Sequence, residues 1–284
     1  QKTLKYCEQA LNMYRALYTG TGNHKSIALS LNNVGAAYHA LGQYKKTLEY
    51  TKDALNMYQA LYNTDNHKRI ALSLNSVGAA YYALGQYQEA FKYNQQALKM
   101  RQALYKDNHP ELAISLNDVG IAYYALGQYQ EALNHYQRAL EMRQALYTGN
   151  HPELATSMNN VGAAYHALGR YQKTLKYCEQ ALNMYRALYK DNHPSVASSL
   201  NNIGNVYNSL GEPTKALQYH QEALTMRKVI YEGNHPELAT SLNNIGNVYY
   251  SLGEYTKALQ YHQEALTMRK VIYEGNHPEL ATSL

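Results

Sequence analysis

Residues 242–255 read LNNIGNVYYSLGEY, and this stretch decides the fold because related copies of it recur along the chain. It has the pattern of a helix, yet it contains three asparagines and, at Gly246, a glycine that costs about 1 kcal/mol relative to alanine. The related copies begin at Leu31, Leu74, Leu116, Met158, Leu200 and Leu242, so the period is 42 residues after a first interval of 43. The chain is therefore an array of tandem repeats.

The composition of the 284-residue chain reflects this copying, with 31 tyrosines, one phenylalanine and no tryptophan. Its net charge of +5 is diffuse, which is too weak to indicate a nucleic-acid or membrane partner. No apolar run approaches the roughly 20 residues of a membrane span. Cys7 and Cys178 are copies of one repeat position, so we expect reduced, buried or half-buried thiols. With no resemblance to a signal peptide at residue 1, we expect a cytoplasmic protein.

Each repeat predicts two helices joined by a tight turn. In one unit we expect the first helix over about residues 110–126, ended by Gly127, and the second over about 129–147. At the start of the next first helix, Asn150 and Glu153 stand at capping-box spacing. No segment alternates apolar and polar residues as a half-buried strand would. The pattern indicates an all-α protein.

One family has a related motif. This unit carries L-x2-V-G-x2-Y from Leu116 to Tyr123, followed by A-x3-Y-x2-A from Ala132 to Ala139. The motif resembles the tetratricopeptide repeat (TPR) signature, with Leu in place of the usual Trp. Because the unit has 42 residues and lacks the family's closing Pro, it is similar to the long TPR-like repeats of kinesin light chains and bacterial multi-repeat proteins. The resemblance implies a right-handed superhelical solenoid of helix-turn-helix repeats.

We expect one TPR-like array over residues 1–284, without a second domain. It has a partial unit at 1–30, and is cut at 284 after units that start near 31, 74, 116, 158, 200 and 242. Solenoid ends normally carry polar caps, which this array lacks. We therefore expect end-to-end association, with residues 1–18 of one copy stacked on residues 277–284 of another.

On a helical wheel the first helix separates into two faces. Gly246 falls on the packing face, where a missing side chain lets two helices approach closely, and we expect alanine to fit there in part. The asparagines fall on the opposite face. In TPR arrays the first helices line a concave groove, so the resemblance implies that this polar face lines it. The predicted groove residues are Asn32, Asn33, Asn75, Asn117, Asn159, Asn160, Asn201, Asn202, Asn205, Asn243, Asn244, Asn247, Tyr82, Tyr124 and Tyr250.

Asparagine amides both donate and accept hydrogen bonds, so a regular row of them suits the backbone of an extended peptide. Tyrosines beside the row add amphipathic contact area. The sequence therefore predicts a protein–protein interaction scaffold that binds an extended or short helical peptide. The alternative is a structural spacer or self-assembling solenoid with no peptide ligand, which near-identical units also fit. The polar face has no Lys or Arg, which disfavours the family's carboxylate clamp and a nucleic-acid backbone.

The other repeated residues predict structural roles rather than catalysis or metal binding. No nucleophile–base pair, phosphate loop or acid pair stands out, so we expect no enzyme activity, catalytic residue, metal or cofactor. One second-helix position varies in type, and its polar members predict loose packing or weak burial; it comprises residues 7, 51, 94, 136, 178, 220 and 262. Histidines in the loops between units are too far apart for one metal ion and are predicted to brace or cap helices. These are His24, His67, His109, His151, His193, His235 and His277.

Overall fold

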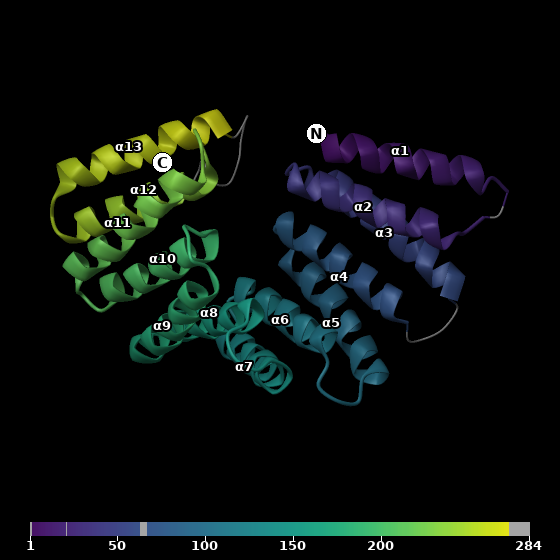
Figure 1. Ribbon diagram of the computed structural model, residues 1–284, viewed down its shortest axis with the longest axis horizontal. Coiled ribbons are helices and arrows are strands. Elements are labelled where there is room, and N and C mark those ends of the chain that lie inside the picture. Colours follow the sequence, from purple (N-terminus) through teal and green to yellow (C-terminus); the bar gives the residue numbers. More distant parts are fainter. Residues whose placement is uncertain (1, 21, 63–66, 273–284) are drawn as a thin grey trace. The chain divides into compact units, whose positions relative to one another are not determined.

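A computed structural model describes residues 2–20, 22–62 and 67–272, and every regular element in these ranges is a helix (Figure 1). The helices are α1 (Lys2–Leu17), α2 (Lys25–Ala40), α3 (Tyr44–Tyr62), α4 (Lys68–Ala83), α5 (Tyr87–Leu104), α6 (Pro110–Ala125), α7 (Tyr129–Leu146), α8 (Pro152–Ala167), α9 (Tyr171–Leu188), α10 (Pro194–Ser209), α11 (Pro213–Ile230), α12 (Pro236–Ser251) and α13 (Tyr255–Ile272). The predicted helix pairs are confirmed, and the bounds of α6 and α7 lie within one residue of those expected. The chain divides into two compact units, residues 1–146 and 147–284.

Within each unit, consecutive helices pack side by side (Figure 1). In the first unit α2 pairs with α3, α4 with α5 and α6 with α7, and in the second α8 pairs with α9, α10 with α11 and α12 with α13. First helices also contact each other, α2 with α4 and α4 with α6, as do α8 with α10 and α10 with α12. Second helices make no comparable contact with one another in the described residues. The first helices therefore form the inner face of each unit.

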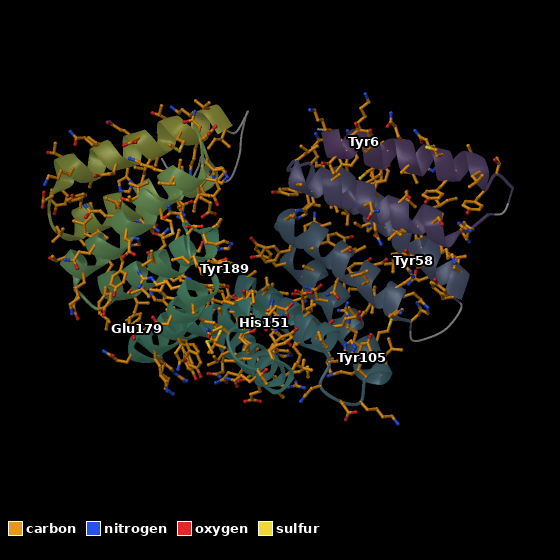
Figure 2. The ribbon with its side chains drawn as sticks, viewed as in Figure 1. Tyr6, Tyr58, Tyr105, His151, Glu179 and Tyr189 are labelled. Atoms are coloured by element: carbon orange, nitrogen blue, oxygen red, sulfur yellow. The ribbon has the colours of Figure 1, made fainter. Side chains whose placement is uncertain are left out.

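Each described first helix begins at a histidine that caps it. The side chain accepts, through Nδ1, a hydrogen bond from the backbone N–H two residues on, at 3.1–3.2 Å. The imidazole stacks at 3.5–3.7 Å on a tyrosine near the end of the preceding helix. Tyr105 and Tyr189 are two such tyrosines (Figure 2). The predicted capping is thus confirmed for His24, His67, His109, His151, His193 and His235.

The capping box predicted at Asn150 and Glu153 is wrong, because the residue with N-cap geometry is His151. Its ring supplies the acceptor that the asparagine was expected to supply. The seventh loop histidine, His277, lies outside the described residues.

Each described first helix ends at a glycine with positive φ. Gly127 has φ 74°, which a residue with a side chain rarely adopts. Its N–H donates to the carbonyl of Tyr124 at 3.0 Å, and the N–H of Gln128 donates to that of Tyr123 at 2.9 Å. This pair of bonds is a Schellman motif, and it confirms the predicted end of the helix.

The glycine inside each first helix faces the variable position of the following second helix. A Cβ added at Gly246 would lie 2.7 Å from Cε1 of His262, and one at Gly204 would lie equally close to His220. The predicted close approach is confirmed, but alanine does not fit at these two positions without a shift of the neighbouring ring. The variable side chains at Cys178 and His220 are each 1% exposed. The prediction of weak burial is therefore wrong at these positions, because each side chain fills the space that a glycine leaves.

Gly204→Ala should destabilise the second unit more than Gly162→Ala. At residue 204 the new Cβ meets the His220 ring at 2.7 Å, whereas at residue 162 its nearest neighbour is Sγ of Cys178 at 3.0 Å. We expect G204A to lower the free energy of unfolding by about 1–3 kcal/mol, and G162A by clearly less. Urea unfolding measures both, and G204A combined with His220→Cys should recover most of the loss. Equal losses in the two single variants would contradict this account of the packing.

Candidate functional site

The candidate site is the open side of the first helices, on the inner face of each unit. Three residues at spacing i, i+4 and i+7 share this side of each helix, and none of them is buried. In the first unit they are Leu29, Asn33 and Ala36 on α2, Leu72, Ser76 and Ala79 on α4, and Ile114, Asp118 and Ile121 on α6. In the second unit they are Thr156, Asn160 and Ala163 on α8, Ser198, Asn202 and Asn205 on α10, and Thr240, Asn244 and Asn247 on α12.

The two units differ in the chemistry of this face. Leu29, Leu72 and Ile114 are 44%, 52% and 37% exposed, so the first unit presents an apolar row. The second unit has Thr or Ser at the same repeat position, and Asn four residues later. Sequence reasoning missed the apolar row because the helical wheel used the last unit, where the same repeat position is Thr240. The available signal was the exchange of Leu or Ile for Thr or Ser between otherwise similar copies.

The first asparagine of each predicted pair lies toward the neighbouring helices. Nδ2 of Asn32 donates to Oγ of Ser73 on the next first helix at 3.1 Å. In the second unit Asn159 donates to Ser199 in the same way, at 3.0 Å. Asn201 is only 5% exposed. The NH2 groups of these amides therefore join adjacent repeats.

Two more of these first asparagines form hydrogen bonds with neighbouring helices. Nδ2 of Asn75 donates to Oδ2 of Asp118 at 2.8 Å, which links α4 to α6. Oδ1 of Asn243 accepts from Nδ1 of His262 on the following second helix at 3.0 Å. Asn117 is half-buried. The structure therefore separates the predicted asparagines into a row between helices and a row on the open face.

The other predicted residues lie on or beside the open face. Asn33, Asn205 and Asn247 are exposed, while Asn160, Asn202 and Asn244 are half-buried. Tyr82 and Tyr250 are 41% and 65% exposed, and Tyr124 is half-buried. Each of these tyrosines packs against the tyrosine that opens the following second helix, with ring centroids 5.2–5.3 Å apart. The face therefore carries exposed amides with aromatic pairs at the C-terminal end of three first helices.

Buried arginines on second helices form hydrogen bonds with residues of the next first helix. Sequence reasoning did not predict them. Nη1 of Arg227 donates to Oγ of Ser241 at 2.7 Å and to the carbonyl of Glu237 at 3.1 Å. The guanidinium of Arg101 bonds Asn75 and Ser115 in the corresponding place. The signal in the sequence was a position that alternates between two residue types. It holds Arg101, Arg143, Arg227 and Arg269 in four copies, and Tyr14, Tyr58 and Tyr185 in three.

Asp118 is an acidic residue at a position that holds Asn or Ser in the other described units. Burial raises its pKa to about 6, although the charges of Arg101 and Arg143 oppose the shift. Because the carboxyl is costly to ionise in this place, its charge responds to mild acidification.

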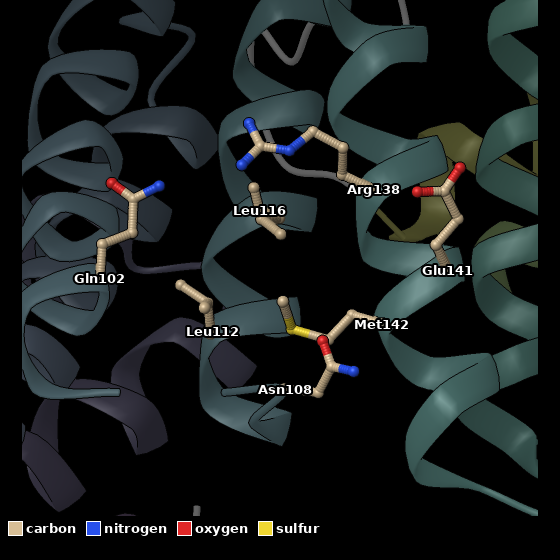
Figure 3. A pocket seen from close by; sticks show the side chains of 7 residues that line it. All are labelled: Gln102, Asn108, Leu112, Leu116, Arg138, Glu141 and Met142. Carbon is tan, nitrogen blue, oxygen red and sulfur yellow. The ribbon is translucent and has the colours of Figure 1, made fainter. Parts of the chain in front are cut away.

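Hollows occur on both sides of the first helices. On the inner face a cavity of about 220 Å³ lies between α2, α3 and α4. A second hollow of about 280 Å³ lies on the opposite side of α6, where Gln102, Arg138 and Glu141 surround Leu112 and Leu116 (Figure 3). The corresponding place in the second unit has a hollow of about 390 Å³, lined in part by Asn192, Val196 and Met226. The second kind of hollow therefore recurs with the repeat.

Neither a metal centre nor a membrane span is found within residues 2–20, 22–62 and 67–272. No three His, Cys, Asp or Glu side chains there lie close enough to hold a metal ion. None of the helices in these ranges is long and apolar enough to cross a bilayer. Both cysteines are free, with Cys178 buried and Cys7 half-buried, as the sequence predicts.

Comparison with known families accounts for this architecture. Tetratricopeptide repeat models match residues 27–67, 69–145, 124–173, 153–228, 200–271 and 237–284. The chain belongs to the tetratricopeptide repeat family. The resemblance read from the first-helix motif is thereby confirmed, whereas a comparison with curated protein sequences gives no match.

Solved TPR structures share the fold at low sequence identity. A putative kinesin light chain of Podospora anserina with nearly identical TPR-like repeats has a TM-score of 0.59 and 20% identity, over 74% of this chain and 99% of its own. BtubC from P. vanneervenii has a TM-score of 0.60 and 20% identity, over 97% and 94%. A Rap protein complexed with Competence and Sporulation Factor has a TM-score of 0.64 and 15% identity, over 98% and 81%. These likenesses confirm the predicted all-α TPR solenoid.

Asp118→Asn should stabilise the TPR array at neutral pH but not at acidic pH. The folded-state pKa of about 6 exceeds the ordinary 3.8, so the carboxyl's contribution to stability is present below about pH 4 and is lost as the pH rises through 6. Asparagine, which occupies residues 160, 202 and 244, carries no such penalty. We expect D118N to gain about 1–2 kcal/mol over the parent chain between pH 4 and pH 7.5, measured by urea unfolding. A difference that stays constant over this range would contradict the shifted pKa.

Proposed function

We propose that this TPR array is a protein-interaction scaffold, and that the inner face of its second unit binds an extended peptide. The observation that carries the proposal is the patch of neutral amides Asn202, Asn205, Asn244 and Asn247, which lies on the open side of α10 and α12. A Rap protein of the same fold has been solved with a bound factor, which supports a ligand on such an array.

The spacing of the patch suits a peptide backbone. Packed helices lie about 8–10 Å apart, and an extended chain advances about 3.3 Å per residue. A peptide that crosses from α10 to α12 therefore meets a new pair of amides at about every third residue. Each amide can donate to a peptide carbonyl and accept from a peptide N–H. Since the residues of the patch are uncharged, the partner is a protein or peptide recognised through its backbone rather than a nucleic acid.

A second candidate function rests on a different observation. The first asparagines, such as Asn32 and Asn159, bond to serines of the next first helix and so join repeats to each other. This favours a structural spacer in which amides serve stacking only. The end-to-end contact predicted for residues 277–284 lies outside the described residues and stays a prediction.

Selection from a random peptide library displayed on phage, with the full chain as bait, separates the two candidates. If the patch binds peptide backbone, Asn202, Asn205, Asn244 and Asn247 changed together to Ala should weaken selected peptides roughly 100-fold or more, because each lost hydrogen bond costs about 1 kcal/mol. The matched control changes four exposed amides on second helices of the same unit to Ala. These are Gln218, Gln221, Gln260 and Gln263.

Fluorescence anisotropy with the selected peptides measures the loss. The control variant should bind as the parent chain does. Failure to enrich any peptide, or equal weakening in both variants, would rule out the peptide face and favour the spacer.

A further inference from the structure

Two kinds of junction join the repeats, and two residues of the second helix distinguish them. One residue faces the first-helix glycine, and the other lies seven residues later. The pairs are Thr51 with Tyr58 on α3, Asn94 with Arg101 on α5, Cys178 with Tyr185 on α9 and His220 with Arg227 on α11. The second helix thus carries either Thr or Cys with Tyr, or a larger polar residue with Arg.

The kind of junction decides whether the amide oxygen of the first asparagine has a partner. Oδ1 of Asn201 accepts from Nδ1 of His220 at 2.9 Å, and Oδ1 of Asn75 accepts from Arg101. Where the second helix has Thr or Cys, Oδ1 of Asn32 and Oδ1 of Asn159 are buried and accept no hydrogen bond.

The unpaired group does not depend on how the amide is turned. In one orientation of the amide, Nδ2 of Asn32 donates to Ser73 and Oδ1 has no partner. Turning the amide over lets Oδ1 accept from the serine hydroxyl, but the NH2 then has no acceptor. An unpaired buried polar group is costly, so a ligand that supplies the missing partner gains free energy that other ligands do not.

At Asn32 this amide borders the inner-face cavity of about 220 Å³. Its lining is largely apolar, formed by alanine and threonine methyl groups, and it contains no carboxylate. The lining residues are Asn32, Ala36, His39, Thr47, Thr51, Ser76 and Ala79. Exposed Leu29 and Leu72 lie one helical turn before Asn33 and Ser76 on the same side of α2 and α4. The cavity therefore has apolar walls, and next to them lies the Asn32 amide, whose Oδ1 is buried without a partner.

Building on the proposed function, we propose that this cavity on the first unit binds one tyrosine side chain of a peptide partner. The ring of a phenol matches the methyl walls, and its hydroxyl both donates and accepts, so it suits the Asn32 amide in either orientation once this buried group turns toward the cavity. A lysine or arginine would bring a charge to a place without a carboxylate, and a leucine or phenylalanine would leave the amide unpaired. The site is specific to the Thr51 kind of junction.

The test uses side-chain analogues as probes, so it does not require the natural partner. p-Cresol and toluene are titrated into the full chain carrying ¹³C-methyl alanine, and the methyl signals of Ala36 and Ala79 are followed by NMR. We expect p-cresol to shift both signals and to bind about fivefold more tightly than toluene, the difference that one hydrogen bond makes.

Thr51→Asn provides the critical variant, because Asn94 is the native residue at the same repeat position. The new side chain occupies the cavity, so p-cresol binding should be lost. Cys178→Asn makes the matching change in the second unit and should leave the Ala36 and Ala79 shifts unchanged. If T51N fails to fold, Ala36→Ile, which copies native Ile121, narrows the same cavity and should also abolish the Ala79 shift.

Equal affinity for p-cresol and toluene, or unchanged p-cresol binding in T51N or A36I, would overturn the assignment. The outcome is separable from that of the proposed function. Selected peptides that depend on the second-unit amides, without p-cresol binding here, refute this cavity alone. Binding of p-cresol without any selected peptide supports the cavity and refutes the peptide face.

Discussion

The contact between a first-helix glycine and the second-helix side chain packed against it is the constraint on which each repeat depends. A Cβ at Gly120 would approach the Tyr136 ring to 2.6 Å, and one at Gly78 would overlap the Asn94 amide. The pair of helices is therefore held at a separation that the second-helix residue sets. Because the glycine lies three residues after the first asparagine, the same contact decides what that asparagine meets. Packing and surface chemistry are thus coupled through a short segment of one helix.

This coupling explains why neighbouring asparagines have different roles. Asn201 and Asn202 are adjacent, yet the first is buried against His220 and Ser241 while the second lies on the open side of α10. Stacking of repeats needs a residue that bonds both its own second helix and the next first helix. Recognition needs a residue that bonds neither. In α10 the pair Asn201 and Asn202 divides these two requirements between successive positions.

Much of the fold could be predicted from the sequence because its signals are local and repeated. The period, the helix pairs, the helix ends at Gly127 and its copies, and the histidine caps all follow from spacing and residue type. The different burial of Asn201 and Asn202 could not be predicted in this way. A helical wheel describes one helix and does not include contacts from the next repeat. The surface that buries Asn201 comes in part from Ser241, one whole repeat away.

The buried arginines and the exposed leucines were not predicted from the sequence, for a related reason. Arg227 is a charged residue, normally exposed, and it is buried because Ser241 and Glu237 of the following helix supply its partners. Leu72 is apolar and yet lies open, because the packing face of α4 is filled by residues such as Leu74 and Val77. Residue type alone would place Arg227 on the surface and Leu72 in the core.

The two kinds of junction have a consequence for how such an array can diversify. Residues 214–241 and 256–283 are identical, so the chain already contains long tracts over which copies can recombine in register. Suppose that an exchange replaced a second helix like α3 by one like α11. The new helix would bring both residues of its pair, as His220 and Arg227 lie on one helix. The hydrogen bonding of the inner face would change at one repeat, while the glycine contact that holds the pair together would keep a side chain it already accommodates elsewhere. Shuffling of units can therefore alter the chemistry of the inner face while keeping helix contacts that already occur elsewhere in the chain.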